Sequence, residues 1–321
     1  MLKENEIFRM TRLPIRLLLC VMSSMTLAGV ANPPPSHPLP AILGCDQSQQ
    51  RIVLLDSNSD WSNESAIKWQ WSANSDQAVQ AEHRKWFRNP TDAKCVALDK
   101  HLLTVASGGA VARVDMEKSR VVAYGYAGRG AHSVAQLPDG LIVTASSSGN
   151  LVQLFEPNKQ NPSELKAIQK VTLSDAHGVT WDNKRGCLWA LGGKQMKQLA
   201  YDPEKTVLSD RATIDLPVTE ESVTHPRHGG HDLVWDKDKK SLLLSDMDHL
   251  WAFDPDTLEF TALVPQSVKS VKSISQHPNT THIILMQATT KWWSDSVVSL
   301  DGSWKKTLPG ARFYKARWYQ E

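Results

Sequence analysis

Three histidines recur at one position of a repeated motif in this chain. His132 lies in A-H-S-V-A, His177 in A-H-G-V-T-W-D and His231 in G-H-D-L-V-W-D. Three imidazoles that converge from neighbouring segments can coordinate a divalent transition metal, with zinc, manganese or iron as candidates, and leave a coordination position open for chemistry. The spacing therefore predicts a metal site formed by these three histidines.

Three lysines occupy the matching position in weaker copies of the motif. They are Lys94 in T-D-A-K-C, Lys272 in V-K-S-I-S and Lys315 in F-Y-K-A-R-W. Like charges held close together raise each other's energy, so the lysines predict a bound anion. A lysine whose pKa is depressed in such a site can act as a catalytic base, and we take all three as candidate catalytic residues. The alternative is that they pair with carboxylates, because Asp92 lies two residues before Lys94.

Other residues near these positions are candidates to contact a substrate. Arg317 follows Lys315 by two residues and so lies on the same face of its strand. Arg129 comes just before the strand of His132, where it can reach the rim of the site. The tryptophans of K-W-W-S-D, Trp292 and Trp293, fall in a loop and could stack on a sugar ring, as could the loop residue Trp61.

The elements that must position these residues are β-hairpins. Residues Asp175 to Leu191 read as a strand, a turn and a returning strand. Related segments recur at intervals of 38 to 54 residues, which suits one four-stranded propeller blade per repeat. In a propeller the first strand of each blade lines the central channel. The six positions should therefore meet in one ring, with three histidines facing three lysines.

The repeats predict an all-β fold, a six-bladed β-propeller. The last opening strand, Ala311–Trp318, has no chain after it to form a blade, whereas the first blade, which starts at Ala41, has no opening strand of its own. We therefore expect the C-terminal strand to complete the first blade, which closes the ring and leaves no free sheet edge.

The N-terminus predicts export. Residues 1–31 carry arginines ahead of an apolar stretch that ends in small residues, which is typical of a secretory signal peptide. The apolar run is too short for a membrane span, so we expect no span after cleavage and a periplasmic or secreted protein. Residues 32–40 form a Pro-rich linker, and residues 41–321 form the propeller domain.

Composition narrows the set of partners. The formal net charge is only +2, and no basic run in the body of the chain is longer than two residues, so nucleic acid is not an expected partner. No pattern signals oligomerisation, and we expect a monomer. Three cysteines remain after signal cleavage, Cys45, Cys95 and Cys187; this odd number argues against a disulfide scaffold but leaves a Cys45–Cys95 pair open.

The motifs of the chain resemble a known family. The segments P-T-D-A-K, A-H-S, H-G-V-T-W-D, G-G-H-D-L, V-K-S and L-P-G-A-R-F-Y-K-A-R-W are similar to those of exported bacterial six-bladed β-propellers whose function is unknown. The resemblance spans about Ala41 to Trp318. It implies the fold and export, and it implies no particular chemistry.

A metal that faces cations suggests a substrate with a carboxylate, sulfate or phosphate group. We expect a metal-dependent enzyme that acts on an anionic, uronate-type saccharide: the metal and the lysines neutralise the carboxylate and acidify the C5 proton, and a lysine or histidine removes it. A lyase is favoured over a hydrolase of phosphate or sulfate esters. The alternative, from another class, is a propeller that binds an anionic glycan or metabolite without catalysis.

Overall fold

The structure is a computed structural model that describes residues 41–96, 101–219 and 229–319. The signal peptide and the Pro-rich linker predicted for residues 1–40 lie outside the described residues. In the described ranges, no helix is long and apolar enough to cross a membrane. Two short 3-10 helices, η1 (Glu64–Ala66) and η2 (Ala81–Phe87), accompany the strands, so the predicted all-β class is correct.

Four of the sheets in the described ranges have four strands each. Their strand orders are β24 (Phe313–Trp318), β1 (Ile42–Asp46), β2 (Arg51–Leu55), β3 (Ile67–Trp71); β12 (Gly178–Asp182), β13 (Cys187–Leu191), β14 (Gln195–Asp202), β15 (Val207–Asp215); β16 (Asp232–Trp235), β17 (Leu242–Ser245), β18 (Leu250–Asp254), β19 (Glu259–Ala262); and β20 (Val271–Gln276), β21 (Ile283–Gln287), β22 (Ser296–Ser299), β23 (Lys305–Thr307).

The prediction of six separate blades is wrong, because the fifth sheet has eight strands. Its order is β4 (Pro90–Val96), β5 (His101–Ala106), β6 (Ala110–Asp115), β7 (Arg120–Tyr126), β11 (Glu164–Thr172), β10 (Leu151–Pro157), β9 (Ile142–Ser146), β8 (Ala131–Gln136). The two expected blades are joined where β7 and β11 pair in parallel, Glu164 with Tyr124 and Leu165 with Gly125. Gly125 permits this approach, since a Cβ there would lie 2.2 Å from the Leu165 carbonyl oxygen.

The C-terminal strand closes the first sheet as predicted. Strand β24 pairs antiparallel with β1, with Ile42 opposite Trp318 and Gly44 opposite Ala316. Gly44 leaves room for the Phe313 ring, which a Cβ at this position would approach to 2.8 Å. The strand is buried along its whole length, so Phe313–Trp318 forms part of the core.

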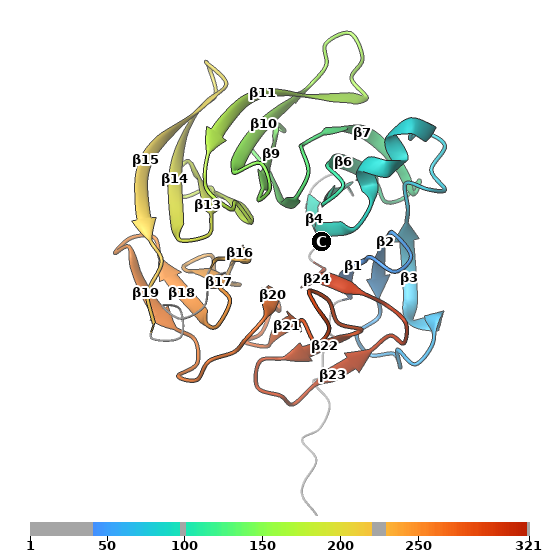
Figure 1. Cartoon of the computed structure of the whole chain (residues 1–321), viewed down its shortest axis with the longest axis vertical. Coiled ribbons are helices and arrows are strands. Elements are labelled where there is room, and N and C mark those ends of the chain that lie inside the picture. Colours follow the sequence, from blue (N-terminus) through green and yellow to red (C-terminus); the bar gives the residue numbers. More distant parts are fainter. Residues whose placement is uncertain (1–40, 97–100, 220–228, 320–321) are drawn as a thin grey trace, which may run out of the picture. The chain divides into compact units, whose positions relative to one another are not determined.

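One edge strand of each four-stranded sheet, and both edge strands of the eight-stranded sheet, lie on the inside of the propeller domain. Strand β8 contacts β4 and β12, and the contacts continue from β12 to β16, β20, β24 and back to β4. Figure 1 shows this succession around the centre of the propeller domain. These six inner strands therefore surround one axis, and their side chains meet there.

Apolar side chains fill the space between neighbouring sheets. Trp189 is fully buried and its ring meets Phe253 of the next sheet edge to face, with centroids 5.2 Å apart. The suggested ligand contact by Trp61 is wrong, because this residue is 1% exposed, packs on Phe313 and donates its indole N–H to the Asp56 carbonyl. No disulfide joins Cys45 to Cys95, so the pair left open by the sequence does not form.

Candidate functional site

A β-bulge at the start of the inner strands decides which side chains meet at one end of the axis. In the ladders of β4, β8 and β20, one residue is unpaired between Pro90 and Asp92, between Ala131 and Ser133, and between Val271 and Ser273. Strand β24 has its bulge opposite Cys45, and His177 and His231 occupy the same place just before β12 and β16. The positions equivalent to one another are Thr91, His132, His177, His231, Lys272 and Tyr314.

The ring therefore differs from the predicted one at two of its six positions. Lys94 lies three residues beyond the bulge residue Thr91, and Lys315 lies one residue beyond Tyr314, so both sit deeper along the axis. Their predicted place in the ring is wrong. A bulge changes the register of a strand by one residue, which accounts for the displacement of Lys315. Lys94 was matched to the histidines by residue type alone, and it lies three residues from the equivalent position.

The three predicted histidines do lie together. The rings of His132 and His177 are stacked, with centroids 4.4 Å apart and planes 13° from parallel. The ring of His231 stands edge-on to His177 at 5.1 Å, and Tyr314 covers the other side of His132 at 5.3 Å. Adjacent inner strands thus supply a continuous row of three imidazoles.

Lys272 and Asp175 hold two of these imidazoles in place. The Lys272 ammonium donates a hydrogen bond to Nε2 of His231 at 2.8 Å, and this is its hydrogen-bond partner among the described residues. His231 therefore accepts at Nε2, and its proton sits on Nδ1. Nδ1 of His177 lies 2.8 Å from the Asp175 carbonyl oxygen, to which it donates, and 3.4 Å from the Asp175 carboxylate.

The geometry of the row does not itself form a metal site. Within the described ranges, no group of three or more His, Cys, Asp or Glu side chains is arranged to hold a metal ion. Imidazole lone pairs lie in the ring plane, so the stacked rings of His132 and His177 direct theirs side by side, and Lys272 occupies the Nε2 lone pair of His231. The metal site stays a prediction, and metal analysis of protein purified without chelators tests it.

Burial sets the protonation states in this row. Desolvation lowers the pKa of His132, His177 and His231 below the ordinary value of 6.5. Neighbouring cationic groups add to this effect at His132 and His231, whereas at His177 Asp175 opposes it. Burial also lowers the pKa of Lys272 to about 8; the Asp175 carboxylate opposes this effect and the charge of Lys315 adds to it. At pH 7 the imidazoles are therefore neutral, and Lys272 is predominantly charged.

These pKa shifts predict that the protein loses stability below pH 6.5. In the unfolded chain the three histidines bind protons near pH 6.5, whereas in the folded protein they resist protonation. The unfolded state then binds more protons, so the free energy of unfolding falls with decreasing pH. Each histidine contributes a slope of up to about 1.4 kcal/mol per pH unit. Urea denaturation between pH 7.5 and 5 measures it.

A matched variant separates the histidines from other groups in this experiment. Carboxylates with lowered pKa lose their contribution only below about pH 4, so the window above pH 5 reports mainly on histidines. Replacing His231 with Asn should remove the contribution of one histidine, which lowers the slope by up to about 1.4 kcal/mol per pH unit. A stability that is constant from pH 7.5 to 5 would show that the row is not held neutral.

The row borders a cavity, here called the mouth cavity, of 1040 Å³. Its wall includes His177 and His231 from the row, Lys272 beside the row, and Asp175 from the loop before β12. Trp292 is at its edge, 47% exposed, with its indole N–H held by the Gln47 side-chain oxygen at 3.1 Å. The remaining charged side chains that line it are Lys194 and Lys291.

Two residues predicted to contact substrate do not line the mouth cavity. Arg129 is exposed on a loop outside its wall. The ring of Trp293 instead lies beneath the Arg312 guanidinium at 5.2 Å. Of the two adjacent tryptophans, only Trp292 therefore reaches the cavity, and loop sequence alone did not distinguish them.

Behind the mouth lies a buried cluster, here called the axial ion network, of Asp92, Asp232, Lys94, Lys315 and Arg317. Arg317 donates to Asp92 Oδ1 through Nε and Nη2, at 2.9 and 2.8 Å, and to both oxygens of Asp232 at 2.7 and 3.0 Å. Lys315 bonds Asp232 at 2.9 Å, and Lys94 lies 3.6 Å from Asp92. The side chains of both aspartates are fully buried.

The network corrects the roles expected for its cations. Lys315 and Arg317 pair with carboxylates inside the propeller, so they do not line the mouth cavity. The alternative of carboxylate pairing is confirmed for two of the predicted lysines, Lys315 with Asp232 and Lys94 with Asp92. Burial is the largest single effect and would raise the pKa of Asp92 and Asp232, but the surrounding cations, Arg317 first and then the lysines, together hold the pKa of both below the usual range. The sequence analysis did not identify Asp232. It could have been noticed as a carboxylate that begins an otherwise apolar inner strand, Asp232–Trp235.

Sheets arranged around one axis, with inner strands that supply a shared site, define this protein as a β-propeller. The chain belongs to the Family of unknown function (DUF6528), whose family model matches residues 2–321. A search of curated proteins found no match. The predicted membership in a propeller family without known function is therefore confirmed.

Solved structures with a similar fold share little sequence with the chain. Kuenenia stuttgartiensis hydrazine synthase is 10% identical, with a TM-score of 0.46 over 66% of this chain and 63% of that one. Dihydro-heme d1 dehydrogenase NirN, in complex with DHE, is 13% identical, with a TM-score of 0.48 over 83% and 53%. The Myceliophteria thermophila Cps50 (Swd1) β-propeller domain is 14% identical, with 0.47 over 65% and 64%. The chain thus spans between about half and two thirds of each structure.

Proposed function

We propose that the mouth cavity binds an anionic saccharide of the uronate type. The observation that carries this proposal is Lys272, an ammonium group that is 8% exposed and has a neutral imidazole as its described hydrogen-bond partner. A buried charge without a close counter-ion is costly, and a ligand carboxylate would lower that cost. Export, expected from residues 1–31, belongs to the same proposal, since it would bring the protein to extracellular saccharides.

The charges around Lys272 favour an anion. Lys194 and Lys291 add two positive charges to the cavity wall, against one carboxylate, that of Asp175. The Asp175 carboxylate lies 3.4 Å from Nδ1 of His177. Cations that line a concave surface raise the local concentration of anions and speed their association. The cavity is therefore suited to a ligand that carries at least one carboxylate.

Trp292 favours a saccharide over an inorganic ion. The Gln47 hydrogen bond fixes the orientation of its indole, and the Lys291 ammonium lies 5.9 Å from its ring centroid. A rigid, half-exposed ring beside cations can pack against the C–H face of a sugar while the lysines bind its carboxylate. The volume of 1040 Å³ is adequate for more than one sugar ring.

A second candidate function is β-elimination at the same site. Lys272, with a pKa of about 8, is close to the range in which a lysine can remove a proton at neutral pH. The neutral base would take the C5 proton of a uronate, the C4–O bond would break with its electrons leaving on oxygen, and a C4=C5 double bond would form. The metal predicted at His132, His177 and His231 would neutralise the uronate carboxylate if it binds.

Removal of the Lys272 charge tests the binding proposal. We expect Lys272→Met to weaken the binding of oligogalacturonate at least about tenfold, because a charge-assisted hydrogen bond contributes about 1.5–3 kcal/mol. Isothermal titration calorimetry measures this, with the methyl-esterified oligomer as the probe without charge. Lys269→Ala is the matched control, since Lys269 is exposed three residues earlier and lies outside the cavity wall.

The outcomes distinguish the two candidates. Binding that requires Lys272 and the free carboxylate, with no product formed, supports a binding protein. An unsaturated product that disappears in Lys272→Met supports the lyase. Equal binding of the esterified oligomer, or an equal loss in Lys269→Ala, would contradict both.

A further inference from the structure

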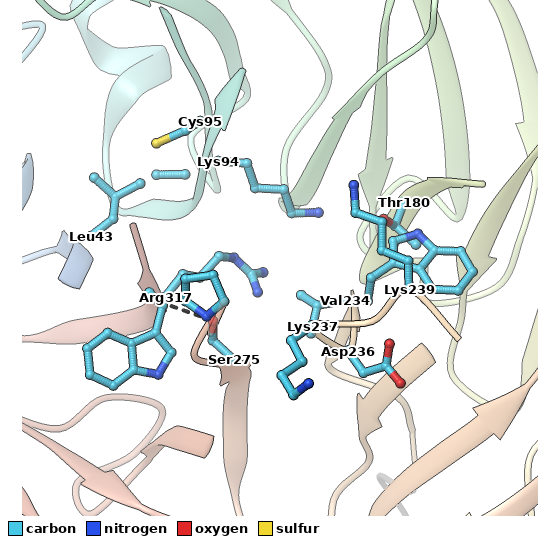
Figure 2. A pocket seen from close by; sticks show the side chains of 14 residues that line it. Leu43, Lys94, Cys95, Thr180, Val234, Asp236, Lys237, Lys239, Ser275 and Arg317 are labelled. Atoms are coloured by element: carbon cyan, nitrogen blue, oxygen red, sulfur yellow. Dashed lines mark hydrogen bonds between the residues drawn. The ribbon is translucent and has the colours of Figure 1, made fainter. Parts of the chain in front are cut away.

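A second cavity lies toward the other end of the six inner strands. Its lining residues come from the later positions of those strands, including Lys94 on β4 and Arg317 on β24, whereas the mouth cavity is lined by residues that precede or open them. The loop after β16 adds Lys237 and Lys239 to the wall. Its volume is 250 Å³. Figure 2 shows this cavity, which we call the distal cavity, with Lys94 and Arg317 directed toward its centre.

The axial ion network behind this cavity has an excess of positive charge. Among the described residues that form it, three cations, Lys94, Lys315 and Arg317, face two carboxylates, Asp92 and Asp232. Arg317 is bonded to both carboxylates and Lys315 to one of them, whereas Lys94 lies 3.6 Å from Asp92. Lys94 also donates hydrogen bonds to the Val179 carbonyl and the Ser133 hydroxyl, at 2.8 and 3.2 Å. The network therefore has a net charge of +1, and it borders the distal cavity through Lys94 and Arg317.

Hydrogen-bond donors remain in the wall of the distal cavity. Arg317 has five N–H groups, and four hydrogen bonds to the two aspartates account for four of them. The indole N–H of Trp318, a lining residue that is 3% exposed, has no partner in the described part of the chain. Buried donors of this kind are normally satisfied, so the wall is suited to a ligand rich in acceptor oxygens.

We infer that the distal cavity binds a small oxyanion, a phosphate or sulfate group. Lys94 and Arg317 line it, as do Lys239 and Lys237, and the Lys237 ammonium pairs with Asp238 at 2.9 Å. The one carboxylate that lines it, Asp236, accepts backbone N–H bonds from Lys240 and Ser241 and so is already engaged. The small volume favours a single anionic group over the larger ligand proposed for the mouth.

Calorimetry with inorganic phosphate, inorganic sulfate and glycerol phosphate tests this inference on the full chain. The double variant Lys237→Gln, Lys239→Asn removes two wall charges without touching the axial ion network; Asn tolerates the positive φ of 52° at position 239. We expect the dissociation constant for phosphate to rise at least about tenfold. Lys240→Gln, exposed next to Lys239 but outside the cavity wall, should leave it unchanged.

Each outcome decides the inference. Phosphate binding that weakens in the double variant but persists in Lys272→Met supports it, whether or not the mouth cavity binds saccharides. Binding of glycerol phosphate as tightly as inorganic phosphate would identify the ligand as a phosphate group on a larger molecule. The inference is overturned if none of the three anions binds, if Lys240→Gln weakens binding equally, or if Lys272→Met abolishes it.

Discussion

Truncation of the chain after Pro309 is expected to abolish cooperative folding. The truncation removes β24, the buried inner strand of the first sheet, and exposes the edge of β1 to pairing with other chains. It also removes Lys315 and Arg317, so Asp92 and Asp232 would be buried without their closest cations. Differential scanning calorimetry should show no unfolding transition, and light scattering should show aggregation.

A shorter truncation is the control for this experiment. Removing only Gln320 and Glu321 leaves β24 and its pairing with β1 intact, so we expect normal melting. A protein truncated after Pro309 that melts like the full chain would contradict closure by the C-terminal strand. Adding a synthetic peptide with the sequence of residues 310–321 should restore part of the transition if the missing strand is the cause.

Replacement of Arg317 with Met is expected to lower the free energy of unfolding by about 3–5 kcal/mol. Arg317 makes four hydrogen bonds to Asp92 and Asp232, and both carboxylates are fully buried. Removing one partner of a buried ion pair leaves charge without compensation, and this accounts for the size of the effect. Urea denaturation at pH 7 measures the change.

A double variant separates lost ion pairing from lost packing. If unpaired carboxylates cause the instability, adding Asp92→Asn to Arg317→Met should recover part of the loss, because one buried negative charge is then removed. Arg51→Met is a useful comparison, since Arg51 pairs with buried Asp46 away from the axis and also with exposed Glu64. Equal stabilities of the wild type and Arg317→Met would contradict a stabilising role of the network.

The sequence by itself determined the class of fold, the closing strand and the convergence of the histidines. A hairpin pattern that repeats with nearly constant spacing is local information, because each strand and turn is encoded by adjacent residues. A histidine at the same place in three repeats must then face the same axis. The unpaired strand at the C-terminus and the missing one at the N-terminus likewise followed from the pattern alone.

Only the tertiary structure decided how the sheets join and how deep each charge lies. The pairing of β7 with β11 joins strands that are far apart in the sequence, and no local pattern reports it. A bulge shifts a strand by one residue and leaves its composition unchanged, so Lys315 lies in the axial ion network while Tyr314 takes the position equivalent to the histidines. The pairing of Asp232 with Lys315 and Arg317 is seen only in the structure, where β16 and β24 meet at the axis. The attraction between buried charges depends on their distance in space, which the sequence does not give.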